Sequence, residues 1–133
     1  MPVTLLNNDI TEKILGCAIR VHRAFGPGLL ESPYKLALAV EFTTAGLLYV
    51  AETPLLVSYG GRDLGVGYRM DFVVEKTVVV EAKAIEGLLP IHRQQLVTYL
   101  KLSGHPIGLL INFNVSLLKN GIVRAVNSSA RER

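Results

Sequence analysis

The chain has 133 residues, of which half are hydrophobic and about a fifth are charged. This composition is typical of one globular domain with a substantial core, and it excludes a disordered chain. The net charge of +3 permits an acidic partner such as nucleic acid but does not require one, because the basic residues are scattered.

Targeting and redox signals favour the cytoplasm. Cys17 is the single cysteine, so an internal disulfide is excluded, and its place in an apolar helical pattern predicts a buried thiol. The first residues lack a basic segment followed by a long apolar run, so we expect no signal peptide. Because no apolar stretch approaches the ~20 residues that span a bilayer, we expect no membrane partner.

Apolar periodicity and turn residues predict an ordered set of elements along the chain. These are a helix capped by Asn8 or Asp9 that runs to Ala24, a helix over 29–44, strands over 52–59, 64–74 and 78–84, a helix over 90–102, and strands over 107–113 and 122–126. The core order α-β-β-β-α-β predicts an α/β fold with a mixed sheet flanked by helices. We expect a single domain over residues 1–133, with its core at about 10–127.

The second and third predicted strands form a hairpin that carries two carboxylates and a lysine. Pairing Val74 with Val78 across the Glu75–Thr77 connection places Asp71 opposite Glu81. Lys83 lies two residues beyond Glu81 and therefore shares its face. Adjacent like charges repel, and a divalent cation such as Mg²⁺ or Mn²⁺ offsets that repulsion.

The alternative is a solvated strand face on which the lysine simply pairs with the acids. The neighbouring residues favour the metal site, because the runs Phe72–Val74 and Val78–Val80 are apolar on both faces. Such runs are typical of buried strands, where carboxylates are costly unless they are paired or bound to a metal.

Two further groups bear on this site. Gln95 and Tyr99 are four residues apart on the helix that begins at Pro90, so they share a face, which suits either contact with a substrate or hydrogen bonding at the core edge. Glu31 stands near the start of the second helix, where the helix dipole favours a carboxylate and where it can also add a third acidic group. His92 fits no zinc spacing.

The segment Gly28-Leu29-Leu30-Glu31-Ser32-Pro33-Tyr34 resembles the GxxExxY proteins of the PD-(D/E)xK nuclease superfamily. The resemblance extends to Arg69-Met70-Asp71, Glu81-Ala82-Lys83 and Ile111-Asn112-Phe113-Asn114. It implies a restriction-endonuclease-like fold with Glu31, Asp71, Glu81 and Lys83 at the catalytic positions. Gln95-Leu96-Val97-Thr98-Tyr99 resembles the QxxxY element of related exonucleases, although Met70 replaces a common proline and Pro33 is unexpected.

On these grounds we expect a Mg²⁺- or Mn²⁺-dependent nuclease. Asp71 and Glu81 are the expected metal ligands, and Glu31 is expected to assist the metal or its water shell. Lys83 is expected to orient the attacking water and to stabilise charge on the phosphate. Gln95 and Tyr99 are expected to position the nucleic-acid strand. DNA is the favoured substrate, and a homodimer is one way for so small a domain to reach two strands. The rival hypotheses are an inactive nucleic-acid-binding or assembly module on the same fold and a small-molecule enzyme in the same pocket.

Overall fold

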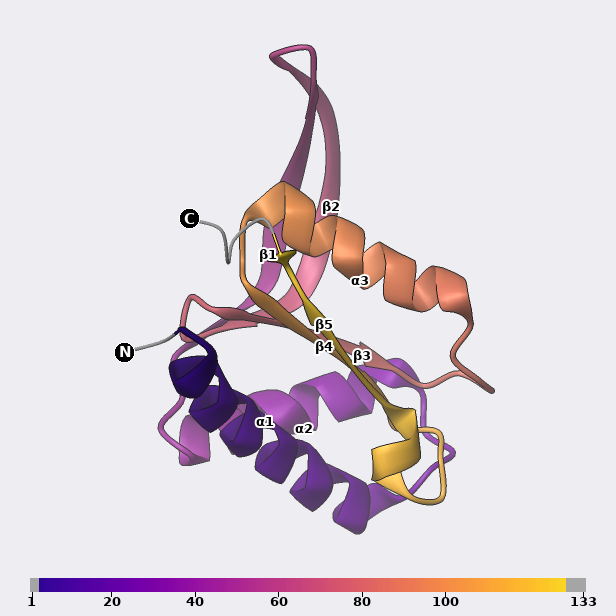
Figure 1. Ribbon diagram of the computed structural model, residues 1–133. Coiled ribbons are helices and arrows are strands. Elements are labelled where there is room, and N and C mark those ends of the chain that lie inside the picture. Colours follow the sequence, from indigo (N-terminus) through magenta and orange to yellow (C-terminus); the bar gives the residue numbers. More distant parts are fainter. Residues whose placement is uncertain (1–2, 129–133) are drawn as a thin grey trace.

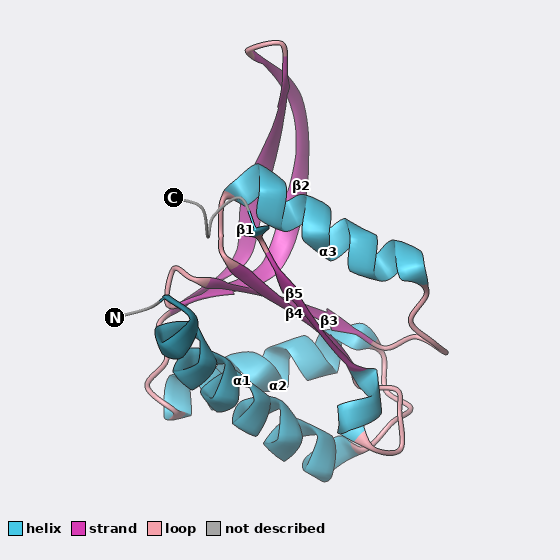
Figure 2. Cartoon of the chain, in the orientation of Figure 1, coloured by secondary structure: helices cyan, strands magenta, loops and turns pink. Residues whose placement is uncertain are grey.

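The computed structural model describes residues 3–128. The elements are α1 (Val3–Phe25), α2 (Glu31–Thr44), β1 (Tyr49–Tyr59), β2 (Arg62–Val74), β3 (Val78–Lys83), α3 (Pro90–Ser103), β4 (Ile107–Asn112), the 3₁₀ turn η1 (Leu118–Gly121) and β5 (Ile122–Val126) (Figure 2). Between residues 3 and 128, no helix is long and apolar enough to cross a bilayer.

The five strands form one sheet in the order β1-β2-β3-β4-β5. Neighbouring strands are antiparallel except β3 and β4, which are parallel and are connected through α3. The predicted mixed sheet is therefore confirmed. The helices α1 and α2 cover one face of the sheet and α3 covers the other, as Figure 1 shows.

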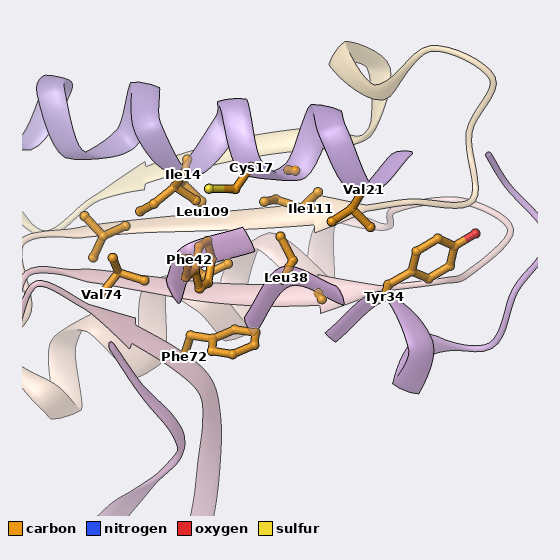
Figure 3. Close-up of a cluster of buried hydrophobic side chains, with 14 of the residues drawn as sticks. Ile14, Cys17, Val21, Tyr34, Leu38, Phe42, Phe72, Val74, Leu109 and Ile111 are labelled. Atoms are coloured by element: carbon orange, nitrogen blue, oxygen red, sulfur yellow. The ribbon is translucent and has the colours of Figure 1, made fainter. Parts of the chain in front are cut away.

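Each face of the sheet has its own apolar cluster. The larger cluster lies between the sheet and the pair α1 and α2, and Figure 3 labels ten of its side chains: Ile14, Cys17, Val21, Tyr34, Leu38, Phe42, Phe72, Val74, Leu109 and Ile111. The second cluster lies under α3 and includes Met70, Val73, Val79, Leu96, Tyr99, Leu100 and Leu110. The expected burial of the Cys17 thiol is confirmed.

The strand β2 twists at Asp71. Strand alternation places Phe72 and Val73 in opposite clusters, but Met70 packs on the α3 side with Val73 rather than on the side of Phe72. On the neighbouring strand, Glu52 has a φ of 52°, a left-handed conformation typical of a strand irregularity. Beyond this point the β1–β2 hairpin curves past α3 and projects from the body of the molecule (Figure 1).

Several predicted boundaries differ from the structure, and two of them are at the starts of the first helix and the first strand. The first helix already includes residues from Val3 onward, so Asn8 and Asp9 lie within it and cannot cap it. The first strand begins at Tyr49 rather than residue 52. The extension adds the pairs Tyr49–Val74, Val50–Val73 and Ala51–Phe72 to the β1–β2 register, on one side of Glu52. The predicted polar tail falls partly on residues 129–133, which lie outside the described part of the chain.

Candidate active site

Asp71 and Glu81 are joined by two reciprocal hydrogen bonds. The β2–β3 register is the predicted one, with Val74 opposite Val78, and its last backbone pair is Phe72 with Val80. At the next position the Asp71 amide donates to Glu81 Oε2 at 2.6 Å. The Ala82 amide donates to Asp71 Oδ2 at 2.9 Å. Each carboxylate therefore binds the backbone of the opposite strand, which fixes both side chains next to each other.

Glu81 is strongly perturbed by this position. Its side chain is 6% exposed. Burial, followed by the nearby negative charge of Asp71, raises the pKa of Glu81 to about 8, although the Asp71 amide and the charges of Lys83 and Lys35 oppose the shift. A buried carboxyl with a strongly raised pKa beside a second carboxyl is typical of a functional site.

A lysine that the sequence did not single out lies against Asp71. Lys35 Nζ, on α2, is 3.1 Å from Asp71 Oδ1 and 2.7 Å from Glu52 Oε1. Burial lowers the pKa of Lys35, but its hydrogen bonds to Glu52 and Asp71 outweigh burial and raise the pKa above its ordinary value. This ammonium offsets part of the repulsion between the carboxylates that the sequence had suggested a metal would offset.

Lys83 is the last residue of β3 and is half-buried. Its positive charge is close enough to Glu81 to stabilise the ionised carboxylate. Its carbonyl accepts a hydrogen bond from the Phe113 amide at 2.9 Å, which extends the β3–β4 pairing beyond the last residue of β4. The expected grouping of Asp71, Glu81 and Lys83 at one end of the hairpin is thus present.

The segment Gly28–Tyr34 builds the entry to α2. Gly28 has a φ of 108°, which favours glycine. The Tyr34 hydroxyl donates to the Gly26 carbonyl at 2.6 Å and accepts from the Leu29 amide at 3.2 Å, while its ring stacks on Phe113. These contacts fix the turn so that α2 begins at Glu31, rather than near Leu29 as predicted.

Glu31 is half-buried at this helix start, four residues before Lys35. In the part of the chain that the structure describes, no group of three acidic, histidine or cysteine side chains is arranged to hold a metal. Glu31 therefore does not complete a three-ligand cluster with Asp71 and Glu81. Its position one helical turn from Lys35 places it on the side of α2 that faces the site.

Two asparagines of the Ile111–Asn114 block hold the loops around the site. The buried Asn112 side chain pairs with Ile85, accepting from the Ile85 amide at 3.1 Å and donating to its carbonyl at 3.0 Å. Asn114 donates to the same carbonyl at 3.3 Å and accepts from the Gly28 amide at 3.1 Å. Asn114 thus links the loop after Lys83 to the loop before Glu31.

Gln95 and Tyr99 share a face of α3, as predicted, but they differ in exposure. Tyr99 is buried and Gln95 is exposed. Burial, and then the charges of Glu81, Tyr68 and Asp71, raise the pKa of Tyr99, so its hydroxyl lies within electrostatic reach of both carboxylates. Both residues line a largely apolar cavity of about 380 Å³, to which Tyr68 contributes from β2 with its ring 5.9 Å from that of Tyr99.

The donor set suits a hard divalent cation. The reciprocal amide bonds use Asp71 Oδ2 and Glu81 Oε2, so neither amide occupies Glu81 Oε1 or Asp71 Oδ1, the second of which contacts Lys35. Adjacent carboxylate oxygens are the ligands that Mg²⁺ and Mn²⁺ prefer. A cation there would also lower the cost of ionising Glu81. The residues present therefore fit a divalent ion bound by two protein carboxylates and water.

Comparison with known proteins agrees with this geometry. A model of the PD-(D/E)XK nuclease superfamily matches residues 8–125. The chain belongs to this superfamily. No curated protein and no solved structure matches it.

Membership of the PD-(D/E)XK nuclease superfamily makes the chain nuclease-like and supports the restriction-endonuclease-like fold, a mixed sheet flanked by helices. Proteins of this superfamily generally use divalent metals and act on nucleic acid. The assignment of the superfamily motif to Asp71 and Glu81-Ala82-Lys83, with Met70 in place of the proline, stays a prediction.

Sequence reasoning missed Lys35 and Glu52. A signal existed for each. Lys35 follows Glu31 by one helical turn, and in the observed β1–β2 register Glu52 lies opposite Asp71, between the pairs Ala51–Phe72 and Thr53–Met70. Neither signal is specific without the packing of α2 and the observed β1–β2 register.

Proposed function

We propose that this chain is a divalent-metal-dependent nuclease that hydrolyses phosphodiester bonds, with DNA as the favoured substrate. The proposal rests on one observation. Asp71 and Glu81 are held side by side by reciprocal backbone bonds, with Lys83 two residues on, in a member of a nuclease superfamily. The resemblance of Gly28–Tyr34 to the GxxExxY proteins, and the Tyr34 contacts that explain the pattern, support placement in that subfamily.

The metal ligands are Asp71 and Glu81, and the Ala82 carbonyl is a candidate third ligand. A bound Mg²⁺ or Mn²⁺ supplies Lewis-acid stabilisation of the phosphate and a more acidic water. Glu81 must be ionised to bind a cation, so its raised pKa couples metal binding to release of a proton. Metal affinity should therefore increase as the pH rises toward 8.

The other polar residues act on the substrate. Lys83 orients the attacking water and stabilises charge that develops on the phosphate oxygens. Glu31, on the side of α2 that faces the site, orders water around the metal. Tyr99, within electrostatic reach of both carboxylates, and Gln95, on the same face of α3, position the nucleic-acid strand. In this proposal the chain acts as a single domain in the cytoplasm, and a homodimer would allow it to act on two strands.

The test is a cleavage assay on single- and double-stranded DNA and RNA with Mg²⁺ or Mn²⁺. Asp71→Asn and Lys83→Ala should each lower the cleavage rate on the order of 10²-fold or more, since each removes a metal ligand or a charge-stabilising group. Both variants should keep a cooperative thermal transition, because asparagine retains the shape of the aspartate side chain and Lys83 is only half-buried.

Matched controls separate chemistry from general charge effects. Asp63→Asn changes another aspartate of β2 near the tip of the hairpin, and Lys119→Ala changes an exposed lysine of η1. Both should cleave like the wild type. If the wild type binds nucleic acid but cuts no member of the panel, the inactive binding module is the better description. If it neither cuts nor binds, the proposed function is wrong.

A further inference from the structure

Lys35 contacts the oxygen of Asp71 that the backbone leaves open to a divalent cation. The amide of Ala82 binds Asp71 Oδ2, so Oδ1 is the oxygen on which no backbone donor competes with a cation. Lys35 Nζ lies 3.1 Å from that oxygen, and its side chain is only 22% exposed. An ammonium and a divalent ion cannot both contact one carboxylate oxygen closely without strong repulsion between the two cations.

Glu52 gives the ammonium a second partner. Lys35 Nζ is closer to Glu52 Oε1, at 2.7 Å, than to Asp71 Oδ1. Glu52 is the more exposed of the two acids, with 47% of its side chain accessible against 13% for Asp71. A lysine side chain has enough rotamers to leave one acid while keeping the other, so Lys35 can leave Asp71 without losing every partner.

We propose that Lys35 competes with the divalent cation for Asp71, and that Glu52 retains the ammonium when the metal binds. This inference rests on the proposed metal site at Asp71 and Glu81. It gives Lys35 a role distinct from that of Lys83, because Lys35 sets how tightly the site binds metal rather than acting on the substrate. Lys35 is accordingly a positioning residue for the site.

Competition predicts the direction in which the Mn²⁺ affinity changes in two single variants and in the double variant. Lys35→Met keeps most of the aliphatic stem and removes the charge, so Mn²⁺ should bind about tenfold more tightly than to the wild type. Glu52→Gln removes the second partner of the ammonium and leaves Lys35 on Asp71, so Mn²⁺ should bind more weakly. In the double variant, Glu52→Gln should cost much less affinity than it does in the wild type, because no ammonium remains to be displaced.

Isothermal titration of MnCl₂ into the four metal-stripped proteins measures these affinities directly and needs no cleavage. Asp71→Asn should abolish the binding heat and so identify the site. Lys13→Met, which removes an exposed lysine of α1, is the matched control and should leave the affinity unchanged.

Thermal melting provides an independent readout. In EDTA, Lys35→Met should melt below the wild type, because it leaves Glu52, Asp71 and Glu81 without this cation. The same concentration of Mn²⁺ should then raise the melting temperature of Lys35→Met more than that of the wild type.

The outcomes distinguish this inference from the proposed function. If the wild type binds Mn²⁺ through Asp71 but Lys35→Met binds it equally or more weakly, the competition is wrong and the metal site stands. If Lys35→Met binds Mn²⁺ and the wild type does not, the competition is supported in its strongest form. If none of the proteins binds Mn²⁺, both the metal site and the competition are wrong.

Discussion

The two ends of the β2–β3 hairpin are held together by different interactions. Near the turn, Phe72–Val74 and Val78–Val80 pair through their backbones and are buried on both faces. At the other end, the carboxylates of Asp71 and Glu81 bind the backbone of the opposite strand. The first end gains stability from apolar burial, whereas the second holds a buried carboxyl and neighbouring charges that oppose folding.

The end near the turn therefore supplies stability, and the end with the carboxylates supplies the chemical groups. Asp71 and Phe72 are adjacent in one strand, yet substitutions at the two residues should change different properties of the protein. Changes at the apolar end should alter the free energy of unfolding without touching the charged groups. Changes at the charged end should alter ionisation and metal binding while the fold survives.

The largest effect on stability is expected from Phe72→Ala. Phe72 is 2% exposed, and its ring packs edge-on against Phe42 at a centroid distance of 5.2 Å and against Tyr49 at 5.8 Å. Removing a buried phenyl ring leaves a cavity and typically costs ~3–5 kcal/mol. Urea unfolding should show this loss, while Asp71→Asn on the neighbouring residue should stay within ~1 kcal/mol of the wild type.

Asp71→Asn has two opposing consequences for stability. It weakens the contact with Lys35 but relieves the repulsion between Asp71 and Glu81. A loss as large as that of Phe72→Ala would mean that the charged end supports the fold as much as the apolar end does, and the contrast between the two would be wrong.

The second prediction concerns pH and Glu81. Because the pKa of Glu81 is raised from 4.5 to about 8, the folded protein holds a proton there that the unfolded chain has already released. The contribution of Glu81 to stability is therefore present below about pH 4.5 and is lost as the pH rises to about 8. In EDTA this loss should be on the order of 2–4 kcal/mol.

Glu81→Gln tests this directly, since glutamine resembles the protonated carboxyl and does not titrate. Its stability relative to the wild type should increase from about pH 5 to about pH 8 in paired urea titrations. Glu86→Gln, which changes an exposed carboxylate of the following loop, should show the pH profile of the wild type. A constant difference between Glu81→Gln and the wild type at all pH values would contradict the raised pKa.

Much of this architecture could be predicted from local patterns. The Glu75–Thr77 connection and the apolar runs determined the pairing of Val74 with Val78, and hence the proximity of Asp71 and Glu81. The helix from Pro90 between two buried strands predicted the mixed sheet. Each of these inferences depends on residues close together in the chain, where turn length and periodicity determine the geometry.

The contact of Lys35 with Asp71 could not be predicted in this way. It joins α2 to β2 across 36 positions of sequence, and it depends on how α2 packs against the sheet and on the twist of β2 at Asp71. The role of Asn114 was missed for the same reason. Its motif was recognised, but its partners are loops distant in sequence, and neither loop has a periodic pattern.

The smallest effect is expected at this asparagine link. Asn114→Ala removes the hydrogen bonds to the Gly28 amide and to the Ile85 carbonyl, which are long, are made to neutral groups and lie near the surface. We expect a loss of about 1 kcal/mol in the free energy of unfolding. Asn120 is an exposed asparagine of η1 that bonds through its backbone amide, which alanine keeps, so Asn120→Ala should cost less.

The more informative measurement is amide hydrogen exchange at Gly28 and Ile85. If Asn114 holds the two loops together, exchange at the Gly28 amide should accelerate in Asn114→Ala, because this amide loses its acceptor, while amides in the middle of β3 keep their protection. At Ile85, whose amide is bound by Asn112 rather than Asn114, a smaller acceleration would show that the loosening passes from one loop to the other. Unchanged exchange at Gly28 would mean that the loop before Glu31 is held by Tyr34 alone, and that the two sides of the site are positioned independently.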